Sequence, residues 1–550
     1  MQTTRASKGI SNTTKIIIAL VVVILILGSY FGYQMLTHPI DTIVMGTTDS
    51  VQSSLDPSDA YDFFGWEIIQ ATGCGLVDIR PGSQAGPNDF VPALATSWSS
   101  SPDGLTWTFT LRRGVKFSDG TGFTSYAVKY SIQRGIEIAN PDGPFLGIGY
   151  GDIINSIETP DDYTVVFHLN FPFAPFLSLM ACPASYVVNP NYAPMQYFRI
   201  NYTEGNARAS SPMDLGPYIL TKWTRVAGKD VEMRLDANPD HWNATGGYPK
   251  TKHIIIKFYS DATALRMAID AGEIDVAFRQ ITATDVKDLQ KKTNVKVWQG
   301  VGAFIQYLVF QEKIKPFDDP RVRQAIAAAV NRTAITSTVF LGLAQPLYSM
   351  VPNGMAGHQD AFKQLGDANY DFVRRTLRDV GYDENHKLVV DLWYESSGHY
   401  ASSPDIAAVL KSSLEASGVI TVNLHGADWP TYRSNMRAES MAVYILGWYP
   451  DYVDPDNYVY PFLHSSGGSW LHDNYASQAM DQLVEESRSE TDAVMRNQLY
   501  AQIQTKLAAD APLVPLFQSS AWAVTRPVVE GVVLDITQNW RHWLLYKTGG

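Results

Sequence analysis

The sequence predicts an α/β protein in which helices alternate with the strands of a parallel sheet. The clearest evidence is a run of patterns in the C-terminal half, with strands at Lys387–Trp393, Val419–Leu424 and Met441–Leu446 and a helix that begins at Ser403 between the first two. The strands are short apolar runs, whereas apolar residues in the helix recur at intervals of three and four. Alternation of this kind is typical of βαβ units. With 550 residues, the chain is long enough for roughly two to four domains.

The remaining elements can be assigned in chain order. We expect strands at Thr42–Thr47 and Thr106–Arg112, and a short strand followed by a turn within Gly114–Gly120. Helices are expected at Ser125–Gly135, after Asp319, at Tyr475–Ser487 and at Ala493–Ala508. In the second of these strands, Trp107, Phe109 and Leu111 alternate with threonines, which predicts one buried and one exposed face.

An apolar segment near the N-terminus, residues 16–36, is long enough to cross a bilayer as a helix. Basic residues precede it, so the positive-inside rule predicts that residues 1–15 stay in the cytoplasm and that the bulk of the chain is extracellular. The alternative is a cleaved secretory signal, but no Ala-x-Ala cleavage pattern follows the segment. Ala6–Ser11 instead resembles an archaeal pilin-like signal, cleaved after Gly9, which would leave the helix as an anchor in the cell membrane.

Composition and motifs narrow the class of function. The net charge of −12 provides no basic surface for phosphates, so we expect no nucleic-acid partner. Cys74 and Cys182 are the only cysteines, too few for a disulfide scaffold and wrongly spaced for zinc; they either pair or stay as two buried thiols. The chain contains no nucleophile elbow, no His-Glu-x-x-His, no P-loop and no dinucleotide fingerprint. We therefore expect no enzyme, no metal and no cofactor.

A series of short motifs, in the same order along the chain, resembles the family 5 extracytoplasmic solute-binding proteins, which serve dipeptide, oligopeptide and nickel ABC importers. The motifs are Ser54–Pro57, Pro92–Gly120, Gly216–Tyr218, Asn238–Trp242, Gly272–Asp275, Asp318–Arg332, Gly447–Asn457 and Ala511–Leu516. The resemblance implies a two-lobed, type II periplasmic-binding-protein fold. Lobe I is expected at 40–299 and 512–550, with an extra subdomain inserted at about 64–211, and lobe II at 300–511. The lobes are expected to close over a ligand as rigid bodies.

The candidate ligand-binding residues lie mainly in Gly447–Asn457, directly after the buried strand Met441–Leu446. In an open α/β sheet, ligands bind outside the carboxyl ends of the strands, and aromatic faces beside carboxylates suit a polar organic ligand. In the family's peptide binders the aspartate of the Gly-Trp-x-x-Asp-Tyr motif pairs with the peptide's α-amino group, which implies that role for Asp451. The other candidates in this loop are Trp448, Tyr449, Tyr452 and Asp454.

The cations that meet the ligand carboxylate in some family members have no match in this chain. Ile445 occupies the place six residues before Asp451, and in the loop Ser396–Ser403 the only candidate cation is His399. A dipeptide clamped at both termini is therefore not expected. A longer peptide held by its backbone is our first expectation and an uncharged oligosaccharide stacked on aromatic side chains the second. We expect a monomer that delivers this ligand to ABC permease subunits.

A function of another class remains as an alternative. Asp451, Asp454 and Asp456 lie close together in the sequence and could supply the carboxylate pair of a glycoside hydrolase. The competing hypothesis is therefore a membrane-tethered extracellular hydrolase.

Overall fold

The computed structural model describes residues 39–549 except 85, 87, 196–212, 280, 398, 401 and 467–469. The predicted membrane-spanning segment 16–36 and the predicted cleavage site after Gly9 lie outside these residues. In the part of the chain that is described, no helix combines the length and the apolar character needed to cross a membrane.

One large sheet runs through the described residues. From edge to edge its strands are β15 (Ile420–Ala427), β14 (Leu388–Glu395), β16 (Val443–Trp448), β12 (Lys296–Phe310), β17 (Leu513–Thr525), β11 (Val276–Phe278), β1 (Thr42–Thr47), β10 (His253–Phe258), β9 (Lys229–Ala237) and β8 (Tyr218–Val226), and β13 (Ala344–Pro346) pairs with β17. The pairs β14–β15, β14–β16, β1–β10 and β1–β11 are parallel, and the other pairs are antiparallel.

The prediction of a parallel sheet is therefore only half right, because the sheet is mixed. The strands on which that prediction rests, β14 and β15, do form a parallel pair around a crossover helix. Several other neighbouring strands pair antiparallel, some across long stretches of sequence and some through a short hairpin. β8 and β9 are joined at Ala227 and Gly228, both with positive φ, and a turn of two residues allows only antiparallel pairing.

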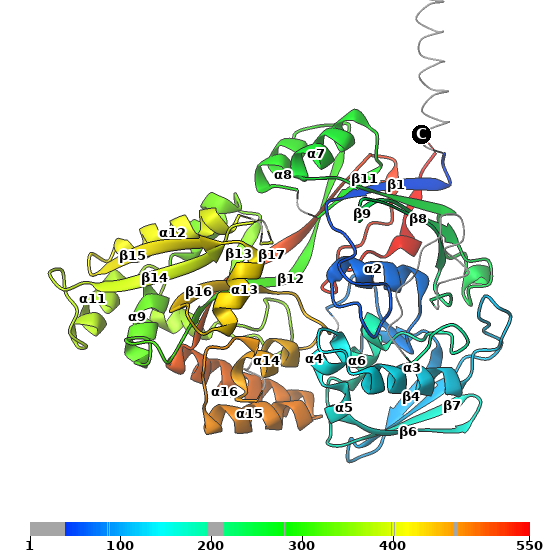
Figure 1. The fold of residues 1–550 in the computed structure, drawn as a ribbon, viewed down its shortest axis with the longest axis horizontal. Coiled ribbons are helices and arrows are strands. Elements are labelled where there is room, and N and C mark those ends of the chain that lie inside the picture. Colours follow the sequence, from blue (N-terminus) through cyan, green and yellow to red (C-terminus); the bar gives the residue numbers. More distant parts are fainter. Residues whose placement is uncertain are drawn as a thin grey trace, which may run out of the picture.

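Figure 1 shows the sheet passing through two halves of the molecule. The half on the left, which we call the β16 half, contains β14–β16 with α9 (Pro320–Ala329), α10 (Arg332–Ala334), α11 (Tyr370–Arg378), α12 (Ser403–Glu415), α13 (Trp429–Arg437), α14 (Tyr460–Leu463), α15 (Gln478–Ser489) and α16 (Ala493–Asp510). The α2 half contains β1 and β8–β11 with α2 (Phe63–Thr72), α3 (Ser125–Ile138), α4 (Pro144–Ile148), α5 (Tyr150–Ile153), α6 (Phe176–Ala181), α7 (Ala262–Ala271) and α8 (Ala283–Leu289). β12 and β17 run from one half to the other.

Smaller sheets complete the α2 half. Four antiparallel strands have the order β4 (Ala95–Ser100), β5 (Thr106–Leu111), β7 (Thr164–Leu169) and β6 (Ile154–Asp161); two-stranded sheets pair β2 (Val77–Ile79) with β3 (Phe90–Pro92) and β18 (Val529–Glu530) with β19 (Tyr546–Lys547). β5 has the predicted alternation, with Phe109 and Leu111 buried and Thr110 exposed. In the segment Gly114–Gly120 the predicted turn forms, with the Gly120 N–H donating to the Phe117 carbonyl, but the predicted short strand does not. Both of its terminal glycines adopt positive φ, and an isolated bridge between Lys116 and Gly122 forms instead.

The long pairing of β12 with β17 is interrupted where the chain passes between the halves. The register shifts between Val301 and Ile305 of β12. Two glycines lie at this point: a Cβ on Gly300 would lie 2.1 Å from the carbonyl oxygen of Leu534, and one on Gly302 would lie 2.1 Å from that of Ser519. Only glycine permits so close an approach of two backbones.

The two cysteines are free, buried thiols rather than a disulfide. Burial raises the pKa of Cys74 to about 12 and also raises that of Cys182, so both thiols stay protonated at neutral pH. The sequence allowed either a disulfide or two buried thiols, and the structure contains two buried thiols.

Candidate ligand-binding site

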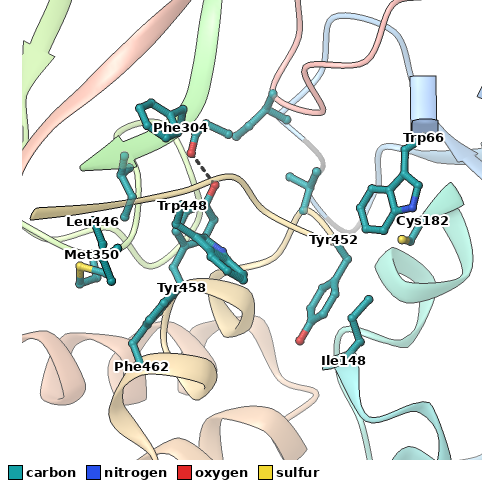
Figure 2. Packing of buried hydrophobic residues seen from close by; sticks show 14 of the residues in the cluster. Trp66, Ile148, Cys182, Phe304, Met350, Leu446, Trp448, Tyr452, Tyr458 and Phe462 are labelled. Carbon is teal, nitrogen blue, oxygen red and sulfur yellow. Dashed lines mark hydrogen bonds between the residues drawn. The ribbon is translucent and has the colours of Figure 1, made fainter. Parts of the chain in front are cut away.

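The loop after β16 is braced by one asparagine. Trp448 is only 8% exposed, and its indole Nε1 donates a hydrogen bond to Asn457 Oδ1 at 3.1 Å. The same oxygen accepts from the backbone N–H of Asp451 at 2.8 Å. In Figure 2 the Trp448 ring lies among Phe462 and Tyr458 on the β16 side. Trp448 thus packs in the core and fixes the loop rather than facing a ligand.

Asn457 also positions Asp451, whose carboxylate lies between the two halves. Its Oδ2 accepts hydrogen bonds from the hydroxyl of Tyr61 at 3.1 Å and from the side-chain amide of Asn457 at 3.3 Å. Among the described residues, none donates to Oδ1, and none forms an ion pair with the carboxylate. Burial raises the pKa of Asp451 to about 7, because a charged carboxylate at this place loses solvation without gaining a cation.

Tyr449 is the part of the loop most open to solvent. Its side chain is 42% exposed. Its ring centroid lies 4.6 Å from that of Phe63, at the start of α2, and 4.4 Å from that of Phe304, in β12. Tyr449 therefore lies between an aromatic ring of the α2 half and one of the central strand.

The remaining aspartates of the loop are already paired with arginines. Asp454 forms two hydrogen bonds of 2.7 and 2.8 Å with Arg496 of α16, and Asp456 lies 3.3 Å from Nε of Arg488 of α15. Asp456 Oδ2 also accepts from the hydroxyl of Tyr452 at 2.6 Å. In Figure 2, Tyr452 points toward Ile148 of the α2 half. These acids fix the shape of the loop, and in the described part of the chain no group of three or more acidic, histidine or cysteine side chains is arranged to hold a metal ion.

His399 belongs to a neighbouring aromatic group at the end of β14. Its ring stacks on Trp429 of α13, with centroids 3.8 Å apart and planes inclined by 9°. The next residue, Tyr400, connects this group to the loop, because its hydroxyl donates to the Gly447 carbonyl at 3.2 Å and its ring lies 6.1 Å from Phe304. The structure thus joins His399 to the loop through Tyr400 rather than through a direct contact with Asp451.

Sequence reasoning missed the residues that the α2 half contributes. Tyr61 and Phe63 contact Asp451 and Tyr449, and the Arg279 guanidinium lies 4.7 Å from the Phe63 ring. Arg279 is itself neutralised by Asp49 and Glu67, at 2.9 and 2.8 Å. The only local signal was the aromatic cluster at 61–64, which by itself is as typical of a core helix as of a site.

Comparisons with known proteins match most of the chain to one protein family. The model of bacterial extracellular solute-binding proteins, family 5 Middle, matches residues 89–470. Di/tripeptide-binding protein 2 of Pseudomonas aeruginosa (strain UCBPP-PA14) is 28% identical over 478 residues, which are 83% of this chain and 85% of that protein. Heme-binding protein A of Haemophilus influenzae is also 28% identical, over 83% of each chain.

Solved structures show the same fold. The ABC transporter-associated periplasmic binding protein DppA from Helicobacter pylori, in complex with the peptide STSA, superposes with a TM-score of 0.75 and is 25% identical; the match covers 92% of this chain and 98% of that one. The two-lobed α/β architecture predicted from the resemblance is confirmed, with a mixed rather than a parallel sheet. Members of the matching family are substrate-binding proteins of transporters and not enzymes, which removes the hydrolase alternative. The chain belongs to the family 5 extracellular solute-binding proteins.

Proposed function

We propose that this protein captures peptides by their free amino terminus, with Asp451 as the anchor. The observation that carries the proposal is the state of its carboxylate, which is largely enclosed, accepts only neutral hydrogen bonds at Oδ2 and has a pKa raised by burial to about 7. An ammonium group at Oδ1 supplies the missing cation through a charge-assisted hydrogen bond, roughly twice as strong as a neutral one. The peptide named in the H. pylori complex and the name of the P. aeruginosa relative support this ligand class.

The carboxyl terminus of the peptide is not bound by a cation of the protein. Ile445 is fully buried in β16, and its backbone N–H donates to the hydroxyl of Tyr432, so this place offers a carboxylate no cation. His399 is stacked on Trp429. We infer that peptides longer than two residues are bound, because affinity then depends on the amine, the backbone and the side chains.

Capture proceeds by closure of two lobes, lobe I at 40–299 and 512–550 and lobe II at 300–511, with the inserted subdomain at about 64–211 moving with lobe I. The register break in β12 supports a hinge at this boundary, because in the described part of the chain the halves are connected there by two strands, β12 and β17. Closure brings the Tyr61–Phe63 segment against the loop that carries Asp451.

In the cell, we propose that the protein works as a monomer, extracellular and held at the membrane by residues 16–36, and that it delivers peptide to ABC permease subunits. Removal of residues 1–38 is expected to release the protein from the membrane fraction without changing ligand affinity. A truncated protein that still sediments with membranes contradicts the anchor.

A thermal-shift comparison tests the ligand class, because a ligand that binds only the folded state raises the melting temperature. We expect a tetrapeptide with a free amine to raise it, and the N-acetylated peptide, an uncharged oligosaccharide and haem to leave it unchanged. Asp451→Asn is expected to abolish the response to the free-amine peptide. The matched control is Asp371→Asn, at a carboxylate that is 92% exposed on α11.

Each other outcome points to a different conclusion. An equal shift with the N-acetylated peptide removes Asp451 from its role as the amine anchor. A shift with the oligosaccharide or with haem alone replaces the peptide proposal by that ligand class.

A further inference from the structure

Four aromatic side chains form a continuous row beside Asp451. Their order is Phe63, Tyr449, Phe304 and Tyr400, and successive ring centroids are 4.6, 4.4 and 6.1 Å apart. These rings come from α2, the loop after β16, β12 and the loop after β14. We call this set the aromatic row. Because it draws on both halves and on a central strand, the row depends on how the two halves pack together.

Tyr449 is the member of the aromatic row that is most exposed to solvent. Phe304 and Tyr400 are buried, and Phe63 is half-buried, whereas Tyr449 is 42% exposed. Beyond Phe63 the row ends at Arg279, whose guanidinium is held by Asp49 and Glu67. A ligand therefore meets the row at Tyr449. Trp448, the residue before it, is the one that packs in the core.

Tyr449 lies two positions before Asp451, the proposed anchor for the peptide's amine. Two contacts link the same two segments of chain: Tyr61 binds Asp451, and Phe63 packs on Tyr449. Each pair of partners is separated by two positions, so the segments run alongside each other. Tyr449 and Asp451 are two positions apart in the loop, so their Cα atoms are at most about 7 Å apart. The side chain of a peptide's first residue lies within such a distance of its own ammonium group.

We propose that Tyr449 is a specificity-determining residue that selects peptides with an aromatic or large apolar side chain at the first position. The inference rests on the proposed binding of the amine at Asp451 and adds the side chain that accompanies it. The physical basis is the burial of apolar area, together with aromatic contact, on the part of the Tyr449 side chain that is exposed. An acidic first residue is disfavoured, because the Asp451 carboxylate that binds the amine lies two positions from Tyr449 and repels a second negative charge.

Isothermal titration with four tetrapeptides tests the inference. The peptides differ only at the first residue, which is Phe, Leu, Gly or Asp. For the unaltered protein we expect affinity to fall in that order, with roughly a tenfold difference between Phe and Gly. Tyr449→Ala is expected to weaken the Phe peptide about tenfold and the Gly peptide less than twofold, while Tyr449→Phe keeps the preference.

The matched control is Tyr546→Ala, because Tyr546 in β19 is 41% exposed and lies outside the site. It is expected to change neither affinity nor preference. A thermal melt of each variant without ligand verifies that the fold is retained.

Two results would overturn the inference while leaving the proposed function in place. The first is a uniform loss across all four peptides in Tyr449→Ala, which assigns Tyr449 to lobe closure rather than to selection. The second is an unaltered protein that binds the four peptides equally. If no free-amine peptide binds at all, the proposed function fails and this inference fails with it.

Discussion

The hydroxyl of Tyr61 donates a hydrogen bond of 3.1 Å to Oδ2 of Asp451, across 390 positions of sequence and from one half of the molecule to the other. This contact joins the proposed amine anchor to the α2 half, since the donor lies two residues before α2 and the acceptor in the loop after β16. A hydrogen bond to a carboxylate favours its ionised form. The bond therefore works against the burial that raises the pKa of Asp451.

Removal of this hydroxyl is expected to weaken peptide binding. In Tyr61→Phe the ring remains, but the pKa of Asp451 rises further and less of the carboxylate is ionised at pH 7. A hydrogen bond to a charged group contributes roughly 1.5–3 kcal/mol, so we expect a loss of about tenfold or more in affinity, measured by titration calorimetry. Tyr126→Phe, at an exposed tyrosine of α3, is the control. An affinity unchanged in Tyr61→Phe contradicts a role for this contact.

Peptide affinity is also expected to depend on pH. Asp451 binds an ammonium only when ionised, and its pKa of about 7 means that affinity rises as the pH increases from 5 to 7. Above about pH 8 the affinity falls again, because the α-amino group of the peptide loses its proton. Titrations from pH 5 to pH 9 in buffers of different ionisation enthalpy test this. A flat profile below pH 7 contradicts the assignment of Asp451.

The loop after β16 could be predicted from the sequence, but the residues that contact it from distant parts of the chain could not. A buried strand followed by Gly-Trp, prolines and aspartates is a local pattern, and it predicted a candidate ligand-binding loop that contains Trp448, Tyr449, Asp451, Tyr452 and Asp454. Whether an aspartate is available to a ligand depends on residues far away in the chain. Asp454 carries the same side chain as Asp451, yet Arg496, on a helix that begins 39 residues later, neutralises it. No spacing rule within the loop distinguishes the two.

The sheet, too, could be predicted from the sequence only where strand pairing follows from a local pattern. Alternation of strand and helix correctly placed β14 and β15 in parallel, because that is a local consequence of the crossover. The pairing of β12 with β17 joins segments about two hundred residues apart. Each of these strands, taken alone, is an apolar run that does not indicate its partner. Tyr61, Phe63 and Arg279 reach the site only after that long-range pairing has positioned the halves.

The two aspartates are expected to respond to substitution with opposite sign. The folded-state pKa of Asp451 is raised above its usual value of 3.8, so its ionised form destabilises the ligand-free fold. This cost is absent below about pH 4, grows as the pH rises and is complete above about pH 7. Asp451→Asn is therefore expected to raise the melting temperature by a few degrees at pH 8 and to leave it nearly unchanged at pH 4.

Asp454→Asn is expected to do the reverse. Asp454 and Arg496 are only 12% and 15% exposed, and loss of the carboxylate leaves a largely buried guanidinium without its counter-ion. We expect a loss of about 3 kcal/mol in the free energy of unfolding at pH 8. Denaturant unfolding of both variants in parallel measures the contrast. Stabilisation by Asp454→Asn contradicts a stabilising ion pair with Arg496, and destabilisation by Asp451→Asn at pH 8 contradicts a destabilising, unpaired carboxylate at that position.

The glycine at the register break provides a test of the hinge. A Cβ at Gly302 would lie 2.1 Å from the carbonyl oxygen of Ser519, so Gly302→Ala forces β12 and β17 apart where the chain passes between the halves. We expect a loss of about 1–3 kcal/mol in the free energy of unfolding, together with a smaller compaction on addition of peptide in small-angle X-ray scattering. Gly122→Ala is the matched control, because a Cβ at Gly122 meets nothing within 4 Å and its φ is not positive. If Gly302→Ala lowers stability but leaves the ligand-induced compaction at its full extent, the break in β12 is a packing feature and the hinge lies elsewhere.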